Sequence, residues 1–135
     1  MAKTKIYSPN QVLAVSFLGG PMAMVFVLWK NFQDLEDAHG MHQILVWGTI
    51  FIVALLLFAP LMPIGWLNYA MPFVYPLAAW SLATQHQMTK QAIAASEIYD
   101  FQTVSNVVAV SIVFLLAMML TAVVWYSALA AIGLI

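Results

Sequence analysis

The chain contains no cysteine and no arginine, and few of its residues carry a charge. The lack of cysteine excludes disulfides, thiolate metal sites, iron–sulfur clusters and cysteine nucleophiles. Four lysines and five acids give a formal net charge of −1, so the chain has no basic surface that could hold a nucleic acid. Nucleic-acid binding is therefore excluded.

Hydrophobic residues dominate what is present. They make up 64% of the 135 residues, and charged residues make up only 7%, against roughly a quarter in an average soluble domain. This balance excludes an ordinary cytosolic protein and favours a polytopic membrane protein. We expect one transmembrane domain over residues 1–135, with an all-α fold that contacts membrane lipid.

Long runs without charge predict where the chain crosses the membrane. A helical span needs about 20 apolar residues, and the segments that fit are 12–29, 44–61, 66–83 and 104–134. The uncharged run from residue 44 to residue 83 is too long for one span, and Pro60, Pro63 and Gly65 predict a hairpin turn within it. Four transmembrane helices in a compact bundle place both termini on one side of the membrane.

Two polar stretches, residues 30–43 and 84–103, are predicted to be loops on the other side. The second stretch has no Pro or Gly, and we interpret it as a helical extension of the third span. The first stretch concentrates the acids Asp34, Glu36 and Asp37. Such a cluster could dock a basic partner through complementary charge.

Small residues predict where helices touch, because membrane helices associate by close approach of their backbones. The positions expected to pack are Ser16, Gly20, Gly48, Ala117 and Thr121. Ala117 and Thr121 belong to a longer stripe of the last span. Packing within the chain is the favoured interpretation of this stripe, and contact with another subunit is the alternative.

Prolines predict kinks in the first and third helices. A proline inside a helix removes one backbone hydrogen bond, and the freed carbonyls need another partner. In transporters with broken helices such carbonyls bind cations, so they could also line a path here. The candidate path residues are Gly19, Gly20, Pro21, Asn68, Pro72 and Pro76. The alternative is a kink that only shapes the helix.

Two histidines are the weak candidates for a metal site. His39 and His42 are spaced so that both imidazoles could lie on one face of a helix. Solvated loop histidines are the favoured interpretation, so we expect neither a metal nor a cofactor. None of the predicted spans holds an Asp, Glu, His or Lys, which weighs against an ion-coupled carrier and against a membrane-embedded enzyme.

The N-terminal part of the chain resembles a set of small bacterial inner-membrane proteins of uncharacterised function. The resemblance rests on Tyr-Ser-Pro-Asn-Gln at residues 7–11, Phe-Leu-Gly-Gly-Pro at residues 17–21 and Lys-Asn-Phe at residues 30–32. It implies a location in a bacterial inner membrane. It brings no activity and no residue roles.

Two classes of function follow from these observations. The favoured one is a non-enzymatic, partner-binding component, either an accessory subunit of a membrane complex or an immunity protein against a membrane-acting toxin. Its partner would be another membrane protein or a second copy of this chain. The alternative is an oligomeric channel or facilitator for a small solute or ion.

Overall fold

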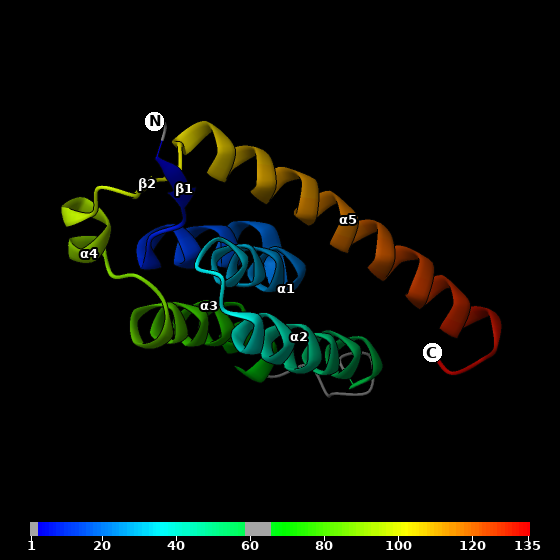
Figure 1. Ribbon diagram of the computed structural model, residues 1–135. Coiled ribbons are helices and arrows are strands. Elements are labelled where there is room, and N and C mark those ends of the chain that lie inside the picture. Colours follow the sequence, from blue (N-terminus) through cyan, green and yellow to red (C-terminus); the bar gives the residue numbers. More distant parts are fainter. Residues whose placement is uncertain (1–2, 59–65) are drawn as a thin grey trace.

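The computed structural model describes residues 3–58 and 66–135, the side chains of residues 66–69 excepted. The elements in chain order are β1 (Thr4–Ile6), α1 (Pro9–Asp34), α2 (Ala38–Phe58), α3 (Trp66–His86), α4 (Lys90–Ala95), β2 (Tyr99–Phe101) and α5 (Val104–Ala131). Helix α1 lies at the centre, with α5 on one side and α2 and α3 on the other (Figure 1). The turn predicted at Pro60, Pro63 and Gly65 lies outside the described residues.

Local hydrogen bonds fix the start of α1. The Ser8 hydroxyl accepts from the backbone N–H of Gln11, and the Gln11 side chain accepts from the backbone N–H of Ser8. Pro9 occupies the first turn, where a missing N–H loses no helical bond. This reciprocal cap starts the helix at Pro9, ahead of the apolar run that begins at residue 12.

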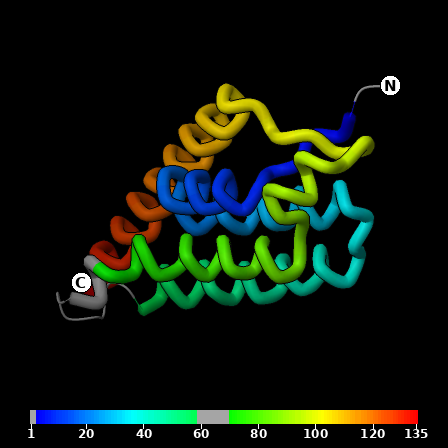
Figure 2. The backbone as a smooth tube through the Cα atoms, turned by 90° about the vertical axis from the view of Figure 1, so that its left-hand side faces the viewer, coloured from blue at the N-terminus to red at the C-terminus, as the bar shows by residue number. Residues whose placement is uncertain are grey.

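Helix α1 reverses direction at Gly20. This residue has φ 85° and ψ −173°, a conformation adopted essentially only by glycine. Tyr7, just before α1, is hydrogen-bonded to Asn31 near its end, although a straight helix would separate residues 24 apart by about 36 Å. Residues 9–19 and 21–34 are therefore antiparallel, and we call them the α1 hairpin (Figure 2).

The hairpin confirms the break predicted beside Pro21, but the break is a reversal and not a kink. The predicted span at residues 12–29 lies within α1, which is long and apolar enough to cross a membrane, but both ends of α1 lie at the end of the molecule where the strands pair (Figure 1). The C-terminus lies at the opposite end, where the Trp125 indole donates to the carbonyl of Leu56 at 2.6 Å. The described N-terminal strand and the C-terminus thus lie at opposite ends of the molecule, and the expectation that both termini share one side of the membrane stays a prediction.

By total length and composition alone, helices α1, α2 and α5 are long and apolar enough to cross a membrane. Their burial differs strongly: half of the apolar window of α1 is buried, against 11% for α2 and for α5. The α1 hairpin supplies most of the core, and its most buried side chains include Val12, Val15, Ala23, Val27 and Leu28. The chain is thus a helical membrane protein built around a protein-covered hairpin.

The segment after α3 corrects the prediction of a helical extension over residues 84–103. Helix α3 ends at His86, the short α4 follows with Thr89 as its N-cap, and β2 pairs in parallel with β1. The Ser96 hydroxyl accepts from the N–H groups of Ile98 and Tyr99, and such local bonds compete with a helix. The fold is therefore predominantly helical, as predicted, with the addition of one small two-stranded sheet.

Candidate functional site

Three side chains, which we call the base clamp, hold the two ends of the α1 hairpin together: Tyr7, Asn31 and Gln87. The Asn31 oxygen accepts from the N–H of Tyr7 at 2.9 Å, and its amide donates to the carbonyl of Tyr7 at 2.8 Å. The same amide donates to the Gln87 oxygen at 2.8 Å, and Gln87 donates to the carbonyl of Leu28 at 3.0 Å. Asn31 is fully buried, so these bonds form away from solvent.

The Tyr7 side chain ties α5 to the clamp. Its phenol donates to the side-chain oxygen of Asn106 in the first turn of α5. Burial, and then the negative charge of Asp34, raise the pKa of the Tyr7 phenol. The hydroxyl therefore stays protonated and keeps donating at neutral pH.

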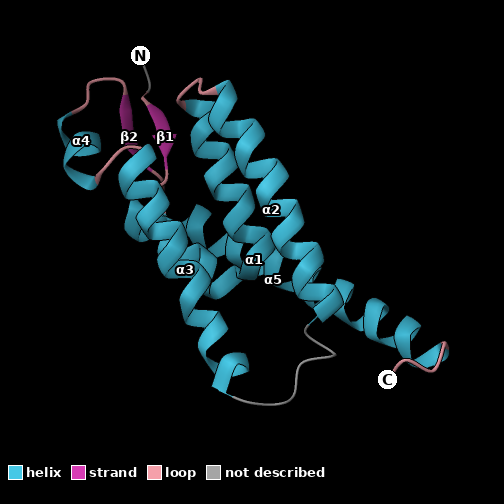
Figure 3. Cartoon of the chain, turned by 90° about the horizontal axis from the view of Figure 1, so that it is seen from below, coloured by secondary structure: helices cyan, strands magenta, loops and turns pink. Residues whose placement is uncertain are grey.

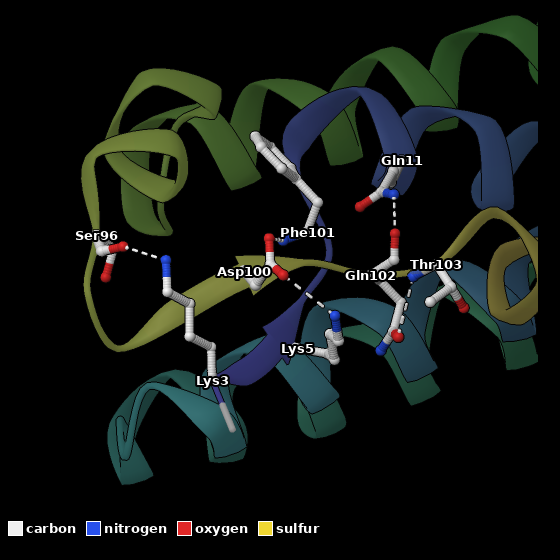
Figure 4. A network of polar contacts seen from close by, with 8 residues as sticks. All are labelled: Lys3, Lys5, Gln11, Ser96, Asp100, Phe101, Gln102 and Thr103. Atoms are coloured by element: carbon white, nitrogen blue, oxygen red, sulfur yellow. Dashed lines mark hydrogen bonds and ion pairs between the residues drawn. The ribbon is translucent and has the colours of Figure 1, made fainter. Parts of the chain in front are cut away.

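Further polar contacts surround the paired strands β1 and β2, next to the base clamp (Figure 4). Lys5 pairs with Asp100 at 3.2 Å, Lys3 donates to the carbonyl of Ser96 at 3.0 Å, and Gln11 donates to the carbonyl of Gln102 at 2.7 Å. The hydrogen bond from Lys5 is the main cause that lowers the pKa of Asp100. These contacts join segments more than 90 residues apart, as the separations of 93, 95 and 91 show.

The three acids expected to form a docking surface have different roles in the structure. Asp34 pairs with Lys30 at 3.0 Å, and the Asp37 carboxylate accepts from the N–H of Gly40 at 2.9 Å in the first turn of α2. Glu36 is exposed and has φ 58° in the turn between α1 and α2. Two of the three carboxylates thus have partners within the chain.

The candidate path residues that the structure describes differ in burial. Gly19 and Pro21 are buried in the hairpin, whereas Pro72 is exposed on α3 and Pro76 is buried. Gly20 forms the reversal, and the side chain of Asn68 lies outside the described residues.

The residues expected at helix contacts differ in their burial and in the neighbours that they contact. Ser16 is fully buried, and its hydroxyl has no hydrogen-bond partner among the described residues. Gly48 meets Val25: a methyl group added at Gly48 would lie 2.6 Å from the Val25 side chain. Ala117 and Thr121 are half-buried, and the Thr121 hydroxyl donates to the carbonyl of Ala117 at 2.8 Å.

The close approach of α1 to α5 occurs at Gly19, one of the candidate path residues and also a small residue four positions before Ala23. A methyl group added at Gly19 would lie 3.1 Å from the Cα of Ser111 and 2.6 Å from the Cβ of Ala23. Ser111 is buried and bonds to the carbonyl of Val107. The packed face of α5 therefore runs through Val107 and Ser111, beside the predicted stripe, much of which is exposed.

The histidines do not form a metal site in the part of the chain that the structure describes, where no group of three or more His, Asp or Glu side chains could hold an ion. His39 instead lines a cleft of about 530 Å³ between α2 and α3, together with His86 and Asp37. His42 is exposed and is not part of the cleft lining.

The chain matches no protein-family model, no curated protein and no solved structure in the three comparisons made.

Proposed function

We propose that the protein is a non-enzymatic integral membrane protein that acts as a partner-binding component of a membrane assembly, with α5 as its docking helix. Accessory subunit and immunity protein are both roles of this kind. A bacterial inner membrane is the proposed location, which rests on the N-terminal resemblance. The observation that carries the proposal is the exposure of α5 along most of its length.

Helix α5 is packed on one side by α1 and is exposed over the rest of its surface. It packs chiefly against α1, and its C-terminal part projects past the other helices (Figure 3). Leu120 and Val124 are 66% and 62% exposed. Because lipid is as apolar as these side chains, close packing with a partner helix is what adds stability in a membrane.

A groove beside α5 gives such a helix a place to pack. Its volume is about 370 Å³, and it is lined by Leu56, Leu120, Thr121, Val124 and Trp125. The hydrogen bond from Trp125 to Leu56 fixes the floor of this groove by joining α5 to α2. Thr121 is small and lies at the groove, where it permits close approach of another backbone.

We further propose that α2, α3 and α5 cross the membrane and that the α1 hairpin enters and returns on the side of the paired strands. Helices α2 and α3 have 21 residues each, about 31 Å, which matches a hydrocarbon core of about 30 Å. Each half of α1 is too short to span that core. Irregular backbone at membrane depth requires protein cover, and α1 is the most buried of the apolar helices.

Conduction, the alternative function, requires a wet path beside the broken backbone. Gly19 and Pro21 instead lie in the packed core, and Pro72 is on an exposed face of α3. This placement favours partner binding over conduction through a single chain.

Cross-linking from single cysteines tests the proposal, since the chain has no cysteine of its own. We expect Leu120→Cys and Val124→Cys to cross-link in native membranes, while Leu77→Cys, 58% exposed on α3, serves as the matched control and does not. A product of twice the chain mass identifies a second copy, and any other mass identifies a different protein. Absence of products from α5, or equal yields from Leu77→Cys, contradicts docking through α5.

A further inference from the structure

The cleft between α2 and α3 lies at the end of the molecule where the strands pair. Its volume of about 530 Å³ is in the range of small-ligand sites. Both helices pack on the α1 hairpin, which leaves space between them. The floor of the cleft is apolar and is made by Phe32, Ile44 and Leu82, of which Phe32 and Ile44 are buried.

One side of the cleft is formed by a row of polar side chains along α2, spaced four residues apart. The Trp47 indole donates to the Gln43 oxygen at 3.0 Å, and the Gln43 amide lies 3.4 Å from Nε2 of His39. When Nε2 accepts from this amide, the His39 proton sits on Nδ1, which is then a free donor. His86 adds a second imidazole from the end of α3.

The charge of the cleft selects its ligand. Asp37 contributes a carboxylate to the lining of the cleft, and no lysine is among the lining residues that the structure describes. One Asp37 oxygen accepts from the N–H of Gly40, and the other can accept from a ligand. A cationic group is therefore attracted, and a ligand with a net negative charge is repelled.

With α2 and α3 crossing the membrane as proposed above, the mouth of the cleft faces the lipid. From His39 to Trp47 the cleft follows α2 for about 12 Å, which connects a polar end to an apolar one. Trp47 is 63% exposed and is flanked by exposed Leu45 and Val46. Tryptophan favours the membrane interface, so acyl chains can enter at this point.

We propose that this cleft is a binding site for a phospholipid with a zwitterionic, primary-amine headgroup. The ammonium group binds the Asp37 carboxylate, and the phosphate oxygens accept from His39 and His86. The acyl chains cover Phe32 and Ile44 and leave past Trp47. An ethanolamine headgroup has this chemistry, whereas a glycerol headgroup lacks the ammonium and carries a net negative charge.

Lipid retention measures the proposal directly. The full chain is placed in bilayer discs that hold equal amounts of phosphatidylethanolamine and phosphatidylglycerol, released into mild detergent, and analysed by native mass spectrometry for bound lipid. We expect phosphatidylethanolamine to be retained about tenfold over phosphatidylglycerol. Equal retention of the two lipids, or retention of neither, overturns the proposal.

Matched variants separate the ligand contacts from general effects on folding. Asp37→Asn keeps an oxygen for the first turn of α2 and should abolish the preference between the lipids. The double change His39→Ala and His86→Ala should lower retention of both lipids, and His42→Ala on the exposed side of α2 should change nothing. A preference that survives Asp37→Asn, or an equal loss with His42→Ala, overturns the proposal.

A variant that changes no polar group tests the site even if the histidine variants unfold. Leu82→Trp places a larger apolar side chain on the floor of the cleft and removes no polar group. We expect it to displace the lipid while the melting temperature of the protein in detergent stays near that of the parent chain. Undiminished lipid retention in a folded Leu82→Trp variant counts against the site.

Discussion

The Asn31 side chain pairs with both backbone groups of Tyr7, at 2.9 Å to the N–H and 2.8 Å to the carbonyl. The amide thus replaces the strand or helix partner that these buried groups lack. Because the two residues are 24 apart, this one pair defines the direction of both halves of α1. The Gln87 side chain then attaches the end of α3 to the same amide.

Loss of the Asn31 amide should destabilise the protein more than loss of most other polar side chains. Asn31→Leu leaves the N–H and carbonyl of Tyr7 unpaired in a buried position, which should lower the free energy of unfolding by about 2–4 kcal/mol. Gln33→Ala, at an exposed position of the same helix, is the control and should have little effect. Denaturant titration in detergent measures both, and similar stabilities for the two variants would argue against the base clamp.

The hydrogen bonds between Tyr7 and Asn31 could not be predicted from the sequence. In the sequence, Asn31 is one of several polar residues that follow the first apolar run. Only the reversal at Gly20 places it beside Tyr7. Gly19, Gly20 and Pro21 do indicate a break. Whether a break gives a kink or a full reversal depends on the φ and ψ of Gly20 and on packing against α3 and α5, which are distant in sequence.

The helical membrane class was predictable because composition and apolar runs determine it. The strand pair was not, since β1 and β2 have three residues each and their pairing is a contact between distant segments. The cleft was not predicted either, because its shape depends on how α2 and α3 pack on α1. The acids Asp34 and Asp37 were found as a cluster, but their partners within the chain were not foreseen.

Gly19 and Gly20 should tolerate alanine poorly for different reasons. Gly20→Ala forces a side chain into the conformation at φ 85°, at a cost of about 1–3 kcal/mol, although the added methyl meets nothing closer than Met118 Cγ at 3.9 Å. Gly19→Ala instead puts a methyl 2.6 Å from the Cβ of Ala23.

Ala23→Gly distinguishes these two causes. It removes the nearest clashing atom and should partly rescue Gly19→Ala, but it should not rescue Gly20→Ala. Thermal unfolding of the single and double variants in detergent provides the comparison. A rescue of Gly20→Ala would show that its cost is steric and not conformational.

The ion pair between Lys5 and Asp100 should contribute little to the free energy of unfolding, and this contribution should depend on pH. The hydrogen bond from Lys5 lowers the pKa of Asp100 in the folded state. The stabilisation by this ion pair is therefore present at neutral pH and is lost as the pH falls through that lowered pKa. Both side chains are about half exposed, so the contribution is small. We expect Asp100→Asn to melt slightly below the parent at pH 7 and the two curves to converge below about pH 4, the region of an unperturbed aspartate. A gap that widens in acid would contradict this assignment.

The reversal of α1 at Gly20 is tested most directly by the sidedness of its two ends. Single cysteines at Thr4, Ala38 and Ile135, in a chain without cysteine, can be labelled in sealed vesicles with a membrane-impermeant maleimide. If the α1 hairpin enters and returns, Thr4→Cys and Ala38→Cys react from the same side of the membrane and Ile135→Cys reacts from the other. Labelling of Thr4→Cys and Ala38→Cys from opposite sides would contradict the hairpin, because α1 would then cross the membrane as one helix.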